Sequence, residues 1–310
     1  MLSGIVNFPD MTAEERRQKL ILPQGKIKVV MDTDTFNEID DQYAVTCALL
    51  EKERMEVLAF HAAPFTNSLS SGPGDGMQKS YEELHRLLDL LGEDRNLAFR
   101  GSETYLPDRN TPVKSDAAYN LIKLANECAS NGEQLYVLAI GAITNVASAL
   151  LLDPTLVKKI TVIWLGGHPF HWRDVREFNY IQDVPAVQVI FDSGVPFIQI
   201  PCRFVAELLN LSRSEIARYC EPCGKIGKFL AQRTYDALGK NNESRVIWDI
   251  STVAYCTLDK TFTSEIVPAP RICDDGYYGS SLGRHEMVVV QHIVRDKVFK
   301  RFFELLKNCK

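Results

Sequence analysis

Five carboxylates crowd into one short stretch of the chain. The segment DTDTFNEIDD holds Asp32, Asp34, Glu38, Asp40 and Asp41 within ten residues. Like charges at this spacing repel one another strongly unless they are protonated or neutralised. Donor sets made only of oxygen favour a hard cation, Ca²⁺ or Mg²⁺, over zinc. The segment therefore predicts a divalent metal site, and the alternative from spacing alone is a solvated acidic turn that caps a helix.

Two other acidic motifs begin with similar residues. An EF-hand loop starting at Asp32 would need Gly at its sixth position and Glu at its twelfth, where this chain has Asn37 and Tyr43. A phosphatase of the haloacid dehalogenase type starts with a hydrophobic strand and DxDx[TV], which VVMDTDTF fits. In that Mg²⁺ enzyme Asp32 would be the nucleophile and Asp34 the acid. The phosphatase alternative stays open, although it gives no role to the second pair of aspartates.

Short apolar runs alternate with helix-length segments along the chain. Their length and β-branched content are typical of strands buried on both faces of a parallel sheet. We expect strands at residues 27–31, 55–60, 135–140, 160–165 and 197–200, and helices at 42–51, 78–91, 117–131, 143–152 and 184–192. This order predicts an α/β fold with a doubly wound, mostly parallel sheet and helices on both faces. The polar stretches 66–76 and 236–245 are expected to be mobile surface loops.

Polar residues follow three of the expected strands. The first strand leads into Asp32-Thr33-Asp34, the third into Gly141-Ala142-Ile143-Thr144-Asn145, and the fourth into Gly166-Gly167-His168. In an open parallel sheet, ligands bind beyond the carboxyl ends of the strands. These segments are therefore expected to meet at one site.

The composition narrows the function classes. The 310 residues carry a net charge of -5, with 45% hydrophobic and 24% charged residues, which is typical of a globular protein and gives no basic surface for nucleic acid. We expect no membrane segment and, because the first residues lack a long apolar run, a cytoplasmic protein. The eight scattered cysteines predict reduced thiols, with Cys220 and Cys223 buried or capping a helix. Residues 1–25 are interpreted as an N-terminal extension and 26–310 as a single catalytic domain.

Four motifs in sequence order resemble the inosine-uridine nucleoside hydrolase family. That family opens with a strand and DxDPGxDD, which Asp32, Asp34, Asp40 and Asp41 match, with TFNEI in a loop two residues longer. GAITNVA at 141–147, EFN at 177–179 followed by Asp183, and Trp248-Asp249 complete the resemblance, which covers residues 27–300. It implies a nucleoside hydrolase fold, a nucleoside as the small-molecule partner, and a homodimer or homotetramer.

The resemblance also implies a metal and a catalytic residue. Asp34, Asp41, Asp249 and the backbone carbonyl of Thr144 are expected to bind Ca²⁺, which suits three carboxylates and a carbonyl. Asp34 is expected to be the general base as well, because a base on the same ion as the attacking water can take its proton at short range.

The remaining matches imply how a substrate binds. Asp40, Asn67, Glu177 and Asn179 align with positions that grip the ribose, and His171 with an asparagine near the 5′-hydroxyl. Many pyrimidine-accepting members carry His immediately before the last metal-binding Asp, where this chain has Trp248. In that respect the chain is similar to the purine-preferring branch, in which an aromatic side chain stacks on the base.

The prediction is therefore hydrolysis of the N-glycosidic bond of a purine or modified purine ribonucleoside, in purine salvage. A 7-deazaguanine nucleoside such as queuosine, or a 5′-phosphate bound by Arg173, is a further hypothesis from the segment HPFHWRD. Besides the phosphatase, the alternative is a non-catalytic nucleoside-binding protein.

Overall fold

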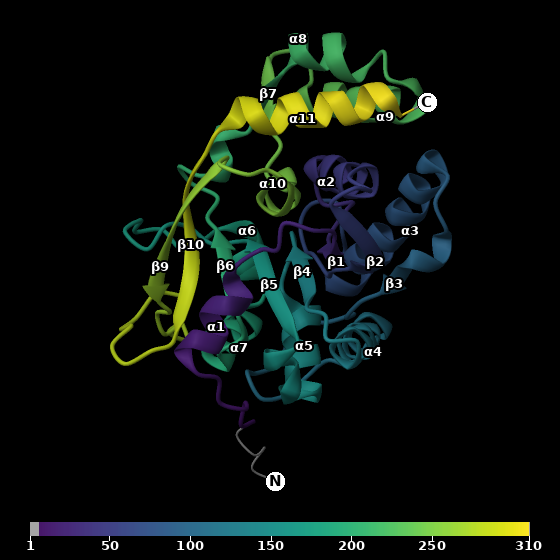
Figure 1. The fold of residues 1–310 in the computed structure, drawn as a ribbon. Coiled ribbons are helices and arrows are strands. Elements are labelled where there is room, and N and C mark those ends of the chain that lie inside the picture. Colours follow the sequence, from purple (N-terminus) through teal and green to yellow (C-terminus); the bar gives the residue numbers. More distant parts are fainter. Residues whose placement is uncertain (1–5, 310) are drawn as a thin grey trace.

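The computed structural model describes residues 6–309, built around one eight-stranded sheet (Figure 1). The strands lie in the order β3-β2-β1-β4-β5-β6-β10-β9. Their bounds are β1 Ile27–Thr33, β2 Met55–Ala62, β3 Ala98–Arg100, β4 Leu135–Ala139, β5 Ile160–Leu165, β6 Phe197–Ile200, β9 Phe262–Pro268 and β10 Glu286–Ile293. Within this sheet, adjacent strands are parallel from β3 through β10, and β9 pairs antiparallel with β10. The predicted fold class and the five predicted strands are confirmed.

The chain reverses its winding direction between β1 and β4. From β1 it proceeds outward through β2 to β3, and then returns to place β4 on the other side of β1. Such a reversal leaves a crevice at the carboxyl ends of the two central strands, where α/β proteins bind their ligands. The residues that follow β1 and β4 are therefore the ones that the topology exposes to a ligand.

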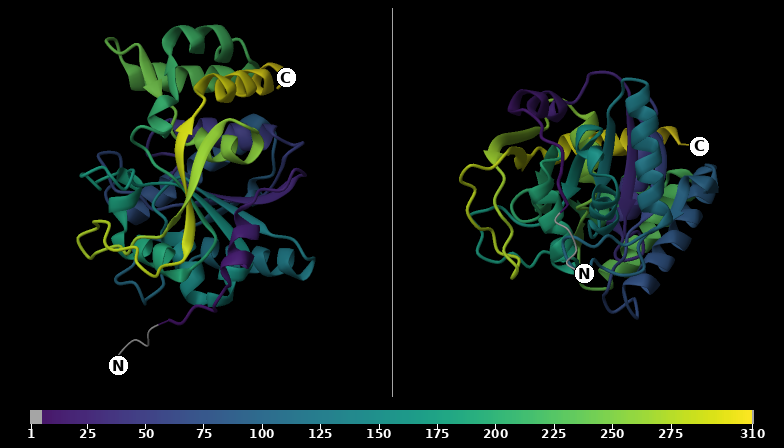
Figure 2. Two further views of the ribbon diagram at one scale, coloured as in Figure 1. Left: turned by 60° about the vertical axis from the view of Figure 1, so that its left-hand side comes forward. Right: turned by 90° about the horizontal axis from the view of Figure 1, so that it is seen from below.

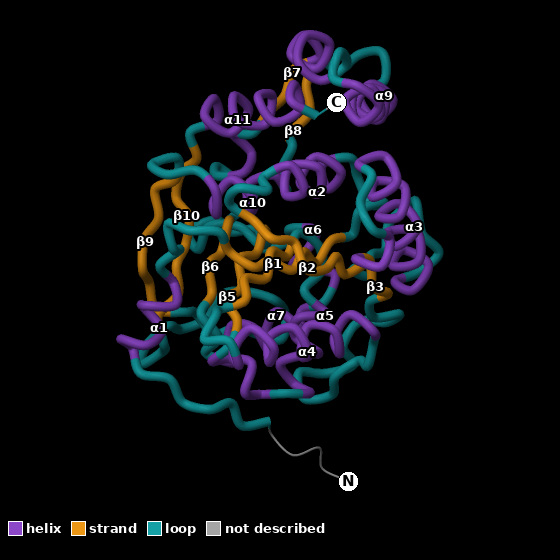
Figure 3. The backbone as a smooth tube through the Cα atoms, turned by 45° about the vertical axis from the view of Figure 1, so that its right-hand side comes forward, coloured by secondary structure: helices purple, strands orange, loops and turns teal. Residues whose placement is uncertain are grey.

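Helices cover both faces of the sheet, and each face has its own hydrophobic core (Figures 1 and 3). The helices α2, α3 and α10 pack on one face, and α4, α5 and α7 on the other. The bounds of all helices are α1 Ala13–Leu20, α2 Asp40–Leu50, α3 Pro73–Leu91, α4 Asp116–Ser130, α5 Thr144–Leu152, α6 Phe178–Gln182, α7 Val184–Ser193, α8 Arg213–Glu215, α9 Gly224–Leu238, α10 Ile250–Thr257 and α11 Arg295–Asn308, with short η1 Arg95–Leu97, η2 Pro154–Lys158, η3 Ala206–Leu208 and the π-helical η4 Ile216–Cys220.

An outer layer lies beyond α2 and α10 (Figure 2). It consists of α8, α9, α11 and a two-stranded antiparallel sheet formed by β7, Asn210–Ser212, and β8, Ser244–Val246. The hydroxyl groups of Tyr43 on α2 and Thr234 on α9 form a hydrogen bond, which joins this layer to the rest of the domain. The sequence analysis did not predict the layer. Cys220 is buried in it, as expected, whereas Cys223 occupies the N-cap position of α9 without a side-chain capping bond, and its thiol donates to the carbonyl of Tyr219.

Two predicted loops are partly helical. Helix α3 begins at Pro73, inside the stretch 66–76, because proline is favoured in the first turn of a helix. Helix α9 continues to Leu238 and β8 begins at Ser244, so only the middle of the stretch 236–245 is a loop. None of the helices within residues 6–309 is long and apolar enough to cross a bilayer.

A half-buried ion pair fastens α11 to the end of α2. Arg301 donates to both carboxylate oxygens of Glu51 at 2.8 and 2.7 Å, and the Glu51 side chain is only 1% exposed. We expect Arg301→Ala to lower the free energy of unfolding by about 2–3 kcal/mol, because the substitution leaves the buried Glu51 carboxylate without its partner. Chemical denaturation measures this change. Arg17→Ala, which removes a pair with Glu286 whose arginine is 50% exposed, is the control and should cost less than about 1 kcal/mol; equal losses would contradict the argument.

Candidate active site

A cavity of about 360 Å³ opens at the carboxyl ends of the central strands. Its lining comes from segments that directly follow β1, β4, β5 and β6, together with the starts of α2, α6 and α10. The lining residues are Asp34, Asn37, Glu38, Asp40, Asp41, Ile140, Leu165, His168, Arg176, Glu177, Phe178, Asn179, Cys202, Arg203, Glu207, Trp248 and Asp249. The cavity therefore occupies the crevice that the topology creates, and carboxylates dominate its polar surface.

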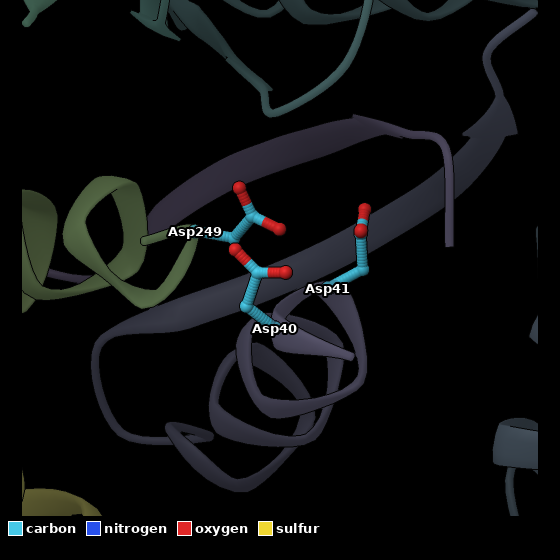
Figure 4. Close-up of side chains that lie close together, drawn as sticks. All are labelled: Asp40, Asp41 and Asp249. Atoms are coloured by element: carbon cyan, nitrogen blue, oxygen red, sulfur yellow. The ribbon is translucent and has the colours of Figure 1, made fainter. Parts of the chain in front are cut away.

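Three aspartates gather on one side of this cavity. One carboxylate oxygen from each of Asp40, Asp41 and Asp249 lies within 4.8 Å of the other two (Figure 4). Asp40 and Asp41 occupy the first turn of α2, while Asp249 is the N-cap residue of α10 and its side chain accepts no capping hydrogen bond from that helix. Since an N-cap aspartate ordinarily binds its own helix, the Asp249 side chain is instead available to the cluster.

Asp34 lines the same cavity from the end of β1. It is completely buried, and neither of its carboxylate oxygens has a hydrogen-bond partner among residues 6–309. A Cβ atom at Gly141 would lie 3.0 Å from the Asp34 carboxyl, so the glycine after β4 makes room for this side chain. Burying an ionised carboxylate that accepts no hydrogen bonds costs free energy unless a positively charged group lies beside it. The donor set of Asp34 and the three clustered aspartates therefore fits a hard divalent cation.

Burial and mutual repulsion disfavour the ionised form of all four aspartates. Burial first, then the charges of neighbouring carboxylates, raises the pKa of Asp34, Asp40 and Asp249 well above the ordinary value. The pKa of Asp41 rises to about 7 through burial, although Thr33 donates a hydrogen bond that opposes the shift. A divalent cation would reverse this balance, because it stabilises the ionised carboxylates directly.

The predicted ligand Thr144 is the first residue of α5 and is fully buried. Its hydroxyl donates to Asp183 Oδ2 at 2.7 Å, and Asp183 also accepts from the backbone of Leu106 and Ala186. Asp183 thus fixes the start of α5 against α7. Calcium binding by the Thr144 carbonyl stays a prediction.

Asp32 lies outside the cavity lining. Asn145 donates to its Oδ2 at 2.9 Å and also contacts the carbonyl of Ala62, while Ser102 donates to the Asn145 side chain. Burial raises the pKa of Asp32 to about 7. The phosphatase alternative needs Asp32 as an accessible nucleophile, and this placement argues against it.

Two predicted ribose-binding residues face the cavity in fixed orientations. Glu177 caps α6 and accepts backbone hydrogen bonds from Gly167, Asn179 and Tyr180. The Asn179 amide nitrogen donates to the carbonyls of Ile140 and Leu165, both at 3.0 Å. Both of its amide hydrogens are therefore used, and its Oδ1 is left as an acceptor for a hydroxyl group.

The other predicted substrate residues differ in position. Asp40 and Trp248 line the cavity, but Asn67 does not, because its amide is bonded to Asn37 at 2.6 Å. His171 lies in a separate surface hollow with Trp172 and Arg173, and its ring stacks on Phe204. Neither residue lines the cavity in this structure, and the roles of Asn67 in gripping the ribose and of His171 near the 5′-hydroxyl stay predictions.

The sequence analysis missed several lining residues. Asn37 belongs to the longer loop after β1, whereas Cys202 and Arg203 follow β6, and Arg176 precedes the EFN motif. The rule that ligands lie beyond strand ends could have identified Cys202 and Arg203. No spacing signal pointed to Asn37 or Arg176.

Comparison with known proteins agrees with this geometry. The model of the family described as inosine-uridine preferring nucleoside hydrolase matches residues 29–299, close to the range of the sequence resemblance. A probable uridine nucleosidase from Arabidopsis thaliana is 22% identical over 228 residues, which are 66% of this chain and 68% of that protein. A pyrimidine-specific ribonucleoside hydrolase from Escherichia coli is 32% identical over 75 residues, which cover only 23% of this chain and 24% of the relative.

Solved structures show the same fold at low identity. A plant nucleoside hydrolase superposes with a TM-score of 0.73 and 20% identity, covering 92% of this chain and 100% of that one. A purine-preferring ribonucleoside hydrolase from Gardnerella vaginalis gives a TM-score of 0.71 and 19% identity, covering 91% and 98%.

The raised pKa values predict how metal affinity depends on pH. Each aspartate must lose its proton to bind a cation. Calcium affinity should therefore rise from pH 5 to pH 8, and calcium binding should release protons, as titration calorimetry in two buffers measures.

Without metal, a carboxyl whose pKa is higher in the folded than in the unfolded chain loses its stabilising contribution as pH rises from about 4 to 7. The melting temperature in chelator should therefore fall over this range. A calcium affinity that does not change with pH would contradict this assignment.

Proposed function

The chain belongs to the inosine-uridine preferring nucleoside hydrolase family and is an N-ribosyl hydrolase, and we propose that its substrate is a purine ribonucleoside. The proposal rests on one observation. Asp34 is buried beside three more aspartates, and its two oxygens have no partner within residues 6–309, in a cavity that also presents acceptors for ribose hydroxyls and an aromatic side chain. Water would be added to C1′, and the products would be the free base and ribose.

Asp34, Asp41, Asp249 and the Thr144 carbonyl are the groups that we propose as Ca²⁺ ligands. Their hard oxygens suit calcium, and family members are typically metal-dependent. When bound, the ion positions the attacking water and the ribose hydroxyls and makes the water more acidic. Asp40 lies against Asp249 in the cluster, where it can accept a hydrogen bond from a ribose hydroxyl (Figure 4).

The side chains of this cavity account for the remaining steps. Asp34 takes a proton from the water, whose oxygen forms the new bond to C1′ while the C1′–N bond breaks and its electron pair leaves with the base. Asn179 Oδ1 and Glu177 accept hydrogen bonds from the ribose. These contacts can strengthen as the ring flattens towards an oxocarbenium-like transition state. Solvent then protonates the departing base.

Trp248 supports the proposed purine preference. It lines the cavity immediately before Asp249, so that a base held near the cluster can stack on the indole. Stacking favours the larger π-surface of a purine over a pyrimidine. The names of similar proteins include both uridine and purine specificity, so the preference rests on this side chain.

The cations at the cavity are Arg176 and Arg203, and Arg173 lies elsewhere. Arg176 is paired with Asp174 at 2.8 Å and Arg203 with Glu207 at 3.0 Å. A 5′-phosphate would compete with these carboxylates, so we propose that uncharged nucleosides are preferred over their 5′-monophosphates. An assay panel of guanosine, a 7-deazaguanine nucleoside such as queuosine, and the matching 5′-monophosphates tests both points. Preference for the monophosphates would reverse the proposal.

We also propose a homodimer or homotetramer, as the family resemblance implies. Sedimentation equilibrium of the calcium-loaded protein measures the state directly. A monomer at micromolar concentration would contradict it.

Replacement of Asp34 by Asn should nearly abolish turnover. The amide would keep the shape of the carboxylate but could not accept a proton, so kcat for inosine should fall by about 10²–10⁴-fold. Release of reducing sugar measures kcat. Asp236→Asn, at an exposed position on α9, is the matched control and should behave like the wild type.

Removal of the metal tests the proposed role of calcium. Activity of the wild type should disappear in chelator and return when calcium is added. Tight nucleoside binding without any turnover would instead indicate a binding protein.

Replacement of Trp248 by Leu should reduce the preference for purines. Loss of stacking should lower kcat/KM for inosine about fivefold to tenfold and have a smaller effect on uridine. The ratio of the two kcat/KM values is the measurement. Trp172→Leu, in the separate hollow and 38% exposed, controls for loss of an indole and should leave the ratio unchanged. An unchanged ratio in the Trp248 variant would exclude base stacking by this residue.

A further inference from the structure

The loop between β1 and α2 is fastened at the edge of the cavity. The backbone N–H of Asn37 donates to the carbonyl of Asp34 at 2.7 Å, which closes a tight turn directly after the proposed base. Arg245 of β8 donates to Glu38 at 2.6 Å. Asn37 and Glu38 both line the cavity as a result. The longer loop therefore contributes a side-chain amide to the wall next to Asp34.

A relay of hydrogen bonds fixes which way that amide points. The backbone N–H of Leu69 donates to Asn67 Oδ1 at 2.7 Å, and a backbone N–H can only donate. The Asn67 oxygen therefore faces Leu69, and its Nδ2 donates to Asn37 Oδ1 at 2.6 Å. This leaves Asn37 Nδ2, which has no hydrogen-bond partner in the part of the chain that the structure describes. Because Asn37 lines the cavity, its N–H groups are free to donate to a ligand there.

A neutral donor is unusual among the groups on this side of the cavity. Asp34, Asp40 and Asp249 are acceptors when ionised, and Asn179 presents only its oxygen. A ribose hydroxyl has one hydrogen to donate and two lone pairs that accept. Carboxylates and Asn179 can satisfy the hydrogen. A bound cation can take one lone pair, and a hydrogen-bond donor is needed for the other.

We propose that Asn37 Nδ2 donates a hydrogen bond to the 2′- or 3′-hydroxyl oxygen of the substrate, and that Asn67 is the positioning residue that holds Asn37 in the donating orientation. The inference rests on the proposed function for the identity of the ligand as a ribonucleoside. It assigns a substrate contact to a residue of the longer loop, in place of the Asn67 side chain.

Binding of a carbon-linked purine nucleoside to the calcium-loaded protein tests the contact without needing turnover, because its glycosidic bond cannot be hydrolysed. We expect Asn37→Ala to raise its Kd about tenfold. The same substitution should change Kd by less than about twofold for either the 2′-deoxy or the 3′-deoxy form of the probe, whichever lacks the contacted hydroxyl. Equal weakening of all three probes, or no weakening, would overturn the contact. Asn96→Ala, at an exposed position in η1, is the control variant.

Two substitutions of Asn67 separate orientation from simple support of the loop. In Asn67→Asp, one oxygen still accepts from Leu69 and the other can accept only from Asn37 Nδ2, so the Asn37 amide turns and presents its oxygen to the cavity. In Asn67→Ala the hydrogen bond to Asn37 Oδ1 is lost, but the Asn37 amide can still donate to the substrate. We therefore expect the Asp variant to bind the probe more weakly than the Ala variant. The opposite order, which a merely structural role predicts, would overturn the assignment of Asn67.

Other measurements on the same proteins keep the two proposals apart. Calcium affinity of each variant shows whether the added charge of the Asp variant acts through the metal. A wild type that binds the probe but does not hydrolyse inosine contradicts the proposed function alone. Hydrolysis by the wild type with unchanged probe binding in Asn37→Ala contradicts the Asn37 contact alone.

Discussion

Four aspartate side chains that are almost fully excluded from water meet at one edge of the central sheet. Asp34 comes from the end of β1, Asp40 and Asp41 from the first turn of α2, and Asp249 from the start of α10. Their charges can coexist there only if protons or a cation neutralise them. The sheet topology creates this conflict, since the winding reversal at β1 and β4 brings the segments together. The chemistry proposed for the cavity depends on a cation resolving it.

The other polar side chains of the cavity are held in fixed orientations by hydrogen bonds within the protein. Backbone amides fix Glu177, two carbonyls fix Asn179, and the relay from Leu69 fixes Asn37. Gly141 leaves room for the Asp34 carboxylate. Such preorganisation lowers the cost of ordering these side chains when a substrate binds. A polyhydroxylated ligand therefore meets acceptors and a donor in fixed positions.

The sequence was sufficient for the centre of the sheet and for most of the acidic cluster, but β3, β9 and β10 were not predicted. Apolar runs predicted the five central parallel strands, and the family resemblance implied that Asp34 and Asp249 share one site, where both line the cavity. The outer layer escaped prediction because its short strands and the amphipathic α9 and α11 lack the continuous apolar runs of the core. Asn67 and His171 do not line the cavity, although the motifs align them with substrate-binding positions, because alignment to a motif cannot show how loops of different length pack. The orientation of Asn37 depends on a contact thirty residues away, which no local pattern encodes.

A crystal structure of the protein grown in calcium, with anomalous scattering used to locate the ion, tests the central claim most directly. We expect one anomalous peak in the cavity, from an ion bound by oxygens of Asp34, Asp41 and Asp249 at about 2.3–2.6 Å. Well-ordered aspartates at saturating calcium with no ion between them would contradict it.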